Sequence, residues 1–294
     1  SSGPLRGRLT TIRRRAARLR WPALRIAHER GRPSRRDADA SDRLPDRLGE
    51  LATIGERLSR HRLVFGQRIE PLFNGDQAYP RMLADIDRAA RSVYLSTYIF
   101  DSDDVGEAFV ARLAVARERG VDVRVIVDGV GEFYGRPRIG RALKRAGIPF
   151  ARFLPPRLLP PQLSLNLRNH HKIVVVDGDT AYTGGMNIGE RHLLDDGDGR
   201  GRAADLQFRI AGPVAGQLEA EFLRTWTFCT GDERRPPEVA ALERGTAAGR
   251  VITDGPDEDL DQLTQLLSSA IAAARRRIDI MTPYFLPPDR KSVV

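Results

Sequence analysis

The sequence predicts an α/β protein, because strand candidates and amphipathic helix candidates alternate along much of the chain. The clearest of them, two helices each followed by an apolar strand, are expected at residues 78–91, 93–100, 108–119 and 121–127. Gly120 closes the second helix, and the strand after it stops at the turn dipeptide Asp128-Gly129. This alternation is typical of domains in which helices cover a sheet.

Shorter elements complete the expected order. Two short strands and a turn at Asn74-Gly75-Asp76 precede the first helix, and further helices and strands follow on either side of a central hairpin. Their expected ranges are 63–65, 69–73, 141–146, 148–153, 206–210 and 215–226. The proline-rich stretch 155–161 is interpreted as a rigid connector, and residues 195–201 as a flexible acidic loop.

Composition limits the functional classes. The chain has 294 residues, of which 41% are hydrophobic and 30% charged, enough for one large domain or two smaller ones. It contains no run of about 18 apolar residues, the length that crosses a bilayer. A single cysteine excludes an intramolecular disulfide. No histidine and cysteine cluster has metal-ligand spacing, so we expect neither a metal nor another cofactor.

The charge indicates an anionic partner. The formal net charge is +9, and the first 36 residues carry twelve arginines opposed only by Glu29. Apolar residues and Trp21 interrupt this basic run, a pattern that favours a helix on an anionic membrane surface. A disordered basic tail, or one that touches RNA without specificity, remains an alternative.

The most informative stretch is residues 169–190. His170 and Lys172 are two residues apart, so on an extended strand they project from the same face. The β-branched run 173–176 predicts a buried strand, Asp177-Gly178-Asp179 a turn, and residues 180–182 a second strand. Gly184 and Gly185, where backbone can approach a ligand closely, then lead to Asn187. The hairpin is therefore expected to present His, Lys and Asn at one end.

These three side chains suit phosphodiester transfer. An imidazole can attack phosphorus, while an ammonium and a carboxamide stabilise the phosphate oxygens. The chain has only three lysines, so a lysine close to a histidine at the start of an apolar strand is not expected to be an ordinary solvated surface residue.

A separate loop, residues 129–140, follows a strand. Its Phe133, Tyr134 and Arg136 are candidate cleft residues, with an ordinary surface loop as the alternative.

The stretch resembles the HKD motif of the phospholipase D superfamily, H-x-K-x4-D-x6-G-[SG]-x-N, and its flanking residues resemble bacterial cardiolipin synthases. The resemblance implies a mixed sheet flanked by helices, with His170 as nucleophile. It also implies that Lys172 and Asn187 hold phosphate oxygens, assisted by backbone N–H groups near Gly184 and Gly185.

Two carboxylates complete the site that the resemblance implies. Asp177 belongs to the motif and is counted with the catalytic residues, although it suits support of the hairpin better than chemistry. Asp205 takes the place of the acidic residue that orients the catalytic imidazole in the superfamily. The segment 202–205 lacks the tryptophan that cardiolipin synthases carry there.

An internal repeat indicates a duplicated architecture. Residues 83–100 and 267–285 both read as a helix with an Ala-Arg-rich end followed by a strand. The sequence contains no second H-x-K, so we expect a fragment of a two-motif enzyme, its first repeat complete and its second only begun. The expected parts are a basic tail, a linker with a helix, the first domain and the start of a second, at residues 1–36, 37–62, 63–235 and 236–294.

The resemblance predicts a phosphatidyltransferase that joins two phosphatidylglycerol molecules through a phosphohistidine, with this chain inactive alone. We expect it to be peripheral to the cytoplasmic side of the bacterial inner membrane. Nucleic acid is not an expected partner, because the basic stretch lacks interleaved aromatics for base stacking. The alternatives are a phosphodiesterase or nuclease of the same superfamily, or a non-catalytic membrane-binding fragment.

Overall fold

The computed structural model describes residues 44, 46–135, 137–156, 168–194, 202–234, 242–253 and 262–280. They fall into two compact units, one of which contains His61–Val251. The other contains the helices α3 (Asp46–Leu58) and α8 (Gln262–Ala273), which contact each other. The basic tail 1–36, the stretch 157–161 and the loop 195–201 lie outside the described residues.

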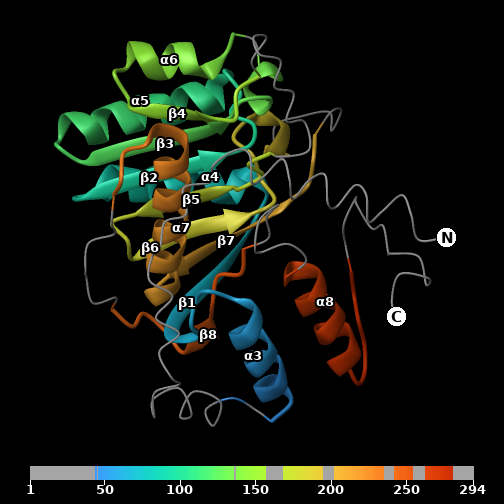
Figure 1. Ribbon diagram of the computed structural model, residues 1–294. Helices are drawn as coiled ribbons and strands as arrows, with labels where there is room; N and C mark the ends of the chain where they lie inside the picture. Colours follow the sequence, from blue (N-terminus) through green and yellow to red (C-terminus); the bar gives the residue numbers. More distant parts are fainter. Residues whose placement is uncertain are drawn as a thin grey trace. The chain divides into compact units, whose positions relative to one another are not determined.

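The larger unit is built on one eight-stranded sheet with the order β4-β3-β2-β5-β6-β7-β1-β8 (Figure 1). Strands β2, β3 and β4 are parallel, and every other neighbouring pair is antiparallel. This confirms the expected mixed sheet. The strands are β1 (Val64–Phe73), β2 (Ser92–Thr97), β3 (Asp122–Asp128), β4 (Phe150–Phe153), β5 (Ile173–Val176), β6 (Thr180–Gly184), β7 (Leu206–Ala211) and β8 (Ala247–Gly249).

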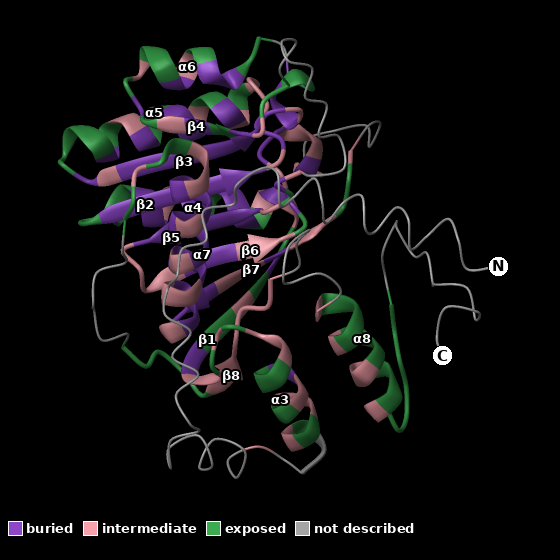
Figure 2. Ribbon diagram, viewed as in Figure 1, coloured by how far each residue is buried: buried purple, intermediate pink, exposed green. Residues whose placement is uncertain are grey.

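Helices cover both faces of the sheet. Alternate residues of the central strands point to opposite faces: Val174 and Val176 of β5 join the core cluster that contains residues of α4, α5 and α6, whereas Val175 joins the cluster of α7. Figure 2 shows the buried central strands between these layers. The helices are α4 (Asn74–Arg88), α5 (Asp104–Glu118), α6 (Ile139–Arg145) and α7 (Pro213–Thr230), with the short 3-10 helices η1 (Gly131–Phe133) and η2 (Glu190–His192).

Strand direction brings distant parts of the sequence to one edge. Because β5 and β7 run antiparallel to their neighbours, their first residues lie beside the last residues of β2, β6 and β1. The last residues of β3 lie there too, since β3 is parallel to β2. We call this the site edge; it carries Thr97, Asp128, Ile173, Gly184 and Leu206.

The first strand and the first helix of this unit differ from the sequence prediction. Residues 64–73 form one strand instead of two, with an irregular register to β8 near Gly66. Asn74-Gly75-Asp76 is the first turn of α4 and does not form the expected separate turn. Asn74 takes a positive φ of 56° and is held by Asp205, whose carbonyl oxygen accepts from its N–H at 2.9 Å. A long-range contact therefore decides where the helix begins.

The second copy of the predicted repeat is confirmed only in its helix. α8 occupies the helical part, but residues 274–280 form neither helix nor strand. The described residues of this unit contain no strand with which the expected one could pair, and an unpaired strand is not stable in water. Residues 281–294 lie outside the described part of the chain.

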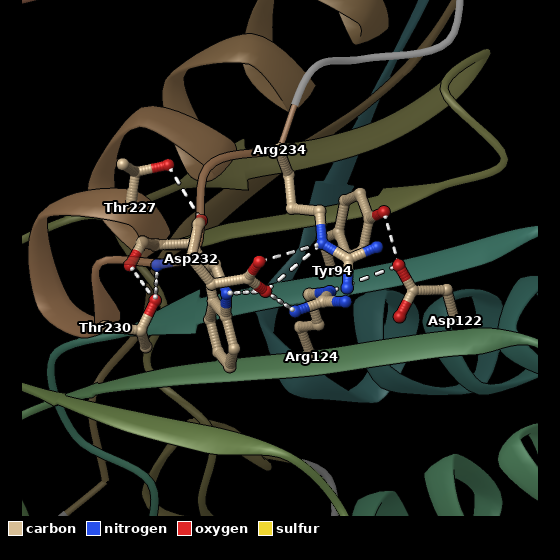
Figure 3. A network of polar contacts seen from close by, with 8 residues as sticks. Tyr94, Asp122, Arg124, Thr227, Thr230, Asp232 and Arg234 are labelled. Atoms are coloured by element: carbon tan, nitrogen blue, oxygen red, sulfur yellow. Dashed lines mark hydrogen bonds and ion pairs between the residues drawn. The ribbon is translucent and has the colours of Figure 1, made fainter. Parts of the chain in front are cut away.

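A polar network fixes the C-terminal end of α7 on the sheet at a distance from the site edge (Figure 3). Asp122, at the start of β3, accepts from the Tyr94 hydroxyl at 2.9 Å and from Arg124 Nε at 3.1 Å. Arg124 also donates to Asp232, just beyond α7, at 3.0 Å. Its guanidinium lies 5.0 Å from the Trp226 ring, so α7 and β3 are joined by charge and by packing.

Candidate functional site

Lys172 and Asn187 line the same small cavity at the site edge. Lys172 directly precedes β5, whereas Asn187 follows β6, and the hairpin between these strands brings the two together. The other side chains of the cavity that carry a polar group are Tyr79, Ser96, Thr97 and Gln207. The structure thus assembles the cation and the carboxamide that the sequence predicted, with His170 two residues from the lysine.

His170 lies at the mouth of the site. It is exposed, and its ring centroid is 4.9 Å from that of Tyr98. Partial burial lowers the pKa of His170 below its ordinary value, the charge of Lys172 lowers it further, and Asp128 opposes both. A neutral imidazole is therefore the main form near pH 7, which is the form that can act as a nucleophile.

Lys172 is largely buried, with 7% of its surface exposed. Its Nζ donates to the carbonyl oxygen of His170 at 3.0 Å and lies 5.5 Å from the centroid of the Tyr98 ring. Burial lowers the pKa of Lys172 to about 8, while the charges of Asp205 and Asp128 act in the opposite direction. The ammonium is thus mainly protonated near pH 7 but loses its proton under mildly alkaline conditions.

Asn187 has its amide oriented by the backbone. Its Oδ1 accepts from the N–H of Ile99 at 3.1 Å, which leaves the NH2 group as a donor. The Tyr79 hydroxyl donates to the carbonyl oxygen of Asn187 at 2.9 Å and fixes the main chain at this point. Burial raises the pKa of Tyr79, so this hydroxyl stays protonated. The carboxamide is therefore prepared to donate to an anion.

The structure gives the two glycines a packing role. The N–H of Gly185 donates to the carbonyl oxygen of Leu206 at 3.2 Å, so it is not directed at a phosphate. A Cβ on Gly185 would lie 2.2 Å from Asp205 Oδ1, and one on Gly184 would lie 2.3 Å from the carbonyl oxygen of Leu206. Glycine is needed here because β6, β7 and Asp205 approach closely.

Asp205 does not contact the imidazole that it was expected to orient. Its Oδ1 accepts from the N–H of Leu206 at 2.7 Å, and among the described residues no hydrogen bond joins it to His170. The reason is strand order: Asp205 precedes β7, which is separated by β6 from the strand that His170 precedes. Its charge acts on the pKa of Lys172 instead.

Asp177 lies at the far end of β5 from Lys172. Its carboxylate accepts from the N–H groups of Ala90, Arg91 and Ser92 at 2.9, 2.6 and 2.9 Å. It therefore joins the hairpin to the connection between α4 and β2. This position fits the supporting role expected for Asp177, and the structure places it away from Lys172 and Asn187.

Sequence reasoning missed Asp128, which ends β3 and is completely buried. It was interpreted only as part of a turn. The available signal was a carboxylate directly after a buried strand.

Among the candidate cleft residues, Tyr134 lies beside Tyr98, with ring centroids 6.2 Å apart. Phe133 is half exposed and stacks against Arg138, and Arg136 lies outside the described residues.

The described residues contain no group of three or more His, Cys, Asp or Glu side chains that could hold a metal ion. The side chains at the site edge are an ammonium and a carboxamide that line one small cavity, and an imidazole two residues from the ammonium. This combination can bind a tetrahedral anion and attack it.

The family comparison agrees with this geometry. Residues 82–226 match the family model described as "Cardiolipin synthase, PLD-like domain". The matched segment contains the motif residues 170–187 and the strands β2 to β7 of the mixed sheet.

The chain is also similar to bacterial cardiolipin synthases. It is 29% identical over 245 residues to the cardiolipin synthase of Geobacillus kaustophilus, covering 81% of this chain and 48% of that protein. It is 32% identical over 243 residues to cardiolipin synthase 2 of Bacillus anthracis, covering 81% of this chain and 47% of that protein. The chain thus spans about half the length of the curated relatives it matches.

Among solved structures, the chain is similar to Nuc, a phospholipase D family member from Salmonella typhimurium. The identity is 20% and the TM-score 0.42, with 55% of this chain and 96% of that chain covered. Phosphatidylserine synthase from Haemophilus influenzae gives 15% identity and a TM-score of 0.42, with 58% of this chain and 39% of that chain covered.

Proposed function

We propose that this chain carries the nucleophile half of a cardiolipin synthase-type phosphatidyltransferase site. The observation that carries the proposal is that Lys172 and Asn187 line one small cavity, with the oxygen of Asn187 already bound by the N–H of Ile99 and His170 two residues from the lysine. The similarity to proteins named cardiolipin synthase supports phosphatidylglycerol as the substrate.

In the first step, a ring nitrogen of neutral His170 attacks the phosphorus of phosphatidylglycerol. The bond between phosphorus and the glycerol oxygen breaks, and a general acid protonates the departing glycerol. The phosphatidyl group is then held on the imidazole as a phosphohistidine. Lys172 and the NH2 group of Asn187 stabilise the phosphate oxygens as their charge is redistributed.

In the second step, a hydroxyl of a second phosphatidylglycerol attacks the phosphohistidine and gives its proton to the base left by the first step. Cardiolipin is released and the imidazole is restored. The acid–base group is the histidine of a second H-x-K motif, and this sequence contains only one such motif. The chain alone is therefore expected to show almost no turnover.

The reaction takes place at a lipid surface. The twelve arginines of residues 1–36 would bind anionic headgroups, each charge near the surface contributing about 1 kcal/mol. No helix of the described residues is long and apolar enough to span a bilayer. We place the protein at the cytoplasmic face of the bacterial inner membrane, held there peripherally.

A lipid assay tests the proposal. Protein expressed from the full reading frame that encodes this chain is incubated with phosphatidylglycerol vesicles, and glycerol and cardiolipin are measured together. The expected result is equal molar release of the two products, abolished by His170→Gln. Release of glycerol without cardiolipin would replace transfer by hydrolysis, and the absence of both products would leave a binding role.

A further inference from the structure

We infer that Asp128 is a positioning residue whose single carboxylate holds two segments beside His170. These are the residues that enter β5 and the loop that begins with η1, and we call them the two flanks. Asp128 ends β3 at the site edge, and none of its surface is exposed. Four donors reach its two oxygens: the N–H groups of Val130, Gly131 and Asn169 and the guanidinium of Arg168. All four groups that contact these oxygens are hydrogen-bond donors. This arrangement suits an ionised carboxylate, which can only accept.

The first flank is the segment that enters β5. Asp128 Oδ2 accepts from the N–H of Asn169 at 3.0 Å. The side chain of Asn169 then donates to Ser96 Oγ at 3.1 Å and accepts from the N–H of His171 at 3.1 Å. The backbone is therefore fixed immediately before and immediately after His170, although the imidazole itself is exposed.

The second flank is the loop that begins with η1. Asp128 Oδ1 accepts from the N–H groups of Val130 and Gly131 at 2.8 and 3.0 Å. A Cβ on Gly131 would lie 1.7 Å from the carbonyl oxygen of Tyr98, so the loop is pressed against the residue whose ring packs on His170. Tyr134, one residue beyond η1, lies next to the same ring.

The charge of Asp128 also reaches the site. It raises the pKa of His170 and of Lys172, whereas Lys172 lowers the pKa of His170. The polar groups around the imidazole are thus Lys172 from its own segment, Asp128 from β3 with its partner Arg168, and Tyr98 beyond β2. Among the described residues, Asp128 is the carboxylate whose charge raises the pKa of His170.

The relevance of Asp128 to the reaction rests on the proposed function, but its positioning role can be measured without turnover. In Asp128→Asn, an NH2 group must face at least one of the N–H donors that the carboxylate accepts. We expect hydrogen exchange to accelerate roughly tenfold at the amides of residues 130–131 and 169–171, the two flanks. We also expect the NMR titration midpoint of His170, assigned with His170→Gln, to move to lower pH.

Two variants separate this role from general loosening. Ser96→Ala removes only the contact to Asn169, so exchange should rise at residues 169–171 and stay unchanged at 130–131. Asp122→Asn makes the same change of charge at the other end of β3, within the network of Figure 3, and should leave both flanks and the His170 midpoint unchanged.

Either of two results would overturn the inference. One is exchange in Asp128→Asn that rises evenly over β2 and β3, or at only one flank. The other is a His170 midpoint that stays constant or rises, because loosening alone relieves the desolvation that lowers this pKa. If wild-type protein formed no cardiolipin, the proposed function would fail while these measurements kept their meaning.

Discussion

Two side chains at the site edge have part of their hydrogen bonding satisfied before any ligand is present. Asn187 uses its oxygen on the N–H of Ile99, and Lys172 uses one of its three N–H donors on the carbonyl oxygen of His170. The groups left for a ligand are the two other N–H bonds of the Lys172 ammonium and the NH2 group of Asn187, and all of these are donors. At the scale of single residues, these two side chains therefore offer mainly hydrogen-bond donors to a ligand, which favours an anion.

The first prediction concerns Asn187. Asn187→Asp keeps the acceptor for Ile99 but replaces the donor by a charged oxygen, so sulfate affinity should fall roughly tenfold or more. Asn187→Ala removes the acceptor as well and should lower the free energy of unfolding by about 1–2 kcal/mol. Calorimetric titration with sulfate and urea unfolding measure the two effects. Unchanged sulfate affinity in Asn187→Asp would remove this residue from the site.

The second prediction concerns the ionisation of Lys172. The pKa of this group is about 8, so sulfate affinity should decrease as the pH rises from 7 to 9, while sulfate keeps its charge over this range. Lys172→Met should bind sulfate weakly and with no such pH dependence. The matched control is Lys144→Met, since Lys144 is exposed on α6 and should behave as wild type. A pH dependence that persists in Lys172→Met would assign the titration to another group.

At the scale of elements, the hairpin of β5 and β6 has a chemical end and a structural end. His170 and Lys172 precede β5, and Asp177 follows it, where three N–H groups donate to its carboxylate. Stability and binding should therefore separate along this hairpin.

The third prediction tests that separation. Asp177→Ala should lower the free energy of unfolding by on the order of 2 kcal/mol, because three backbone donors lose a charged acceptor, and should leave sulfate affinity intact. Asp179→Ala changes the same turn, but its main partner Arg244 is exposed, so a loss below about 1 kcal/mol is expected. Urea unfolding with sulfate titration decides; a loss of binding in Asp177→Ala would place that residue in the chemistry.

Local patterns were sufficient to predict the hairpin, because a β-branched run, a turn and a second strand are adjacent in sequence. The cation and the carboxamide followed from the same stretch. The beginning of α4 did not, since Asn74 and Asp205 are held together by the pairing of β1 with β7. The placement of Asp205 beside Asn74 and not beside His170 could not be predicted for the same reason, because local patterns do not determine strand order.

At the scale of the whole domain, strand order determines which side chains meet. β5 lies in the interior of the sheet between β2 and β6, so the residues before it face the ends of β2 and β3. This arrangement brings Asp128 and Tyr98 to His170 from sequence positions far from the motif. Sequence reasoning could predict an α/β layering but not these neighbours.

The central claim is that His170 carries the phosphatidyl group during transfer. The most direct measurement uses phosphatidylglycerol labelled in its phosphate, protein expressed from the full reading frame, and an alkaline quench that preserves phosphorus–nitrogen bonds, followed by peptide mapping. The label is predicted on His170 and not on the histidine of a second H-x-K motif, which is assigned the acid–base role. Label on any other residue would contradict the claim.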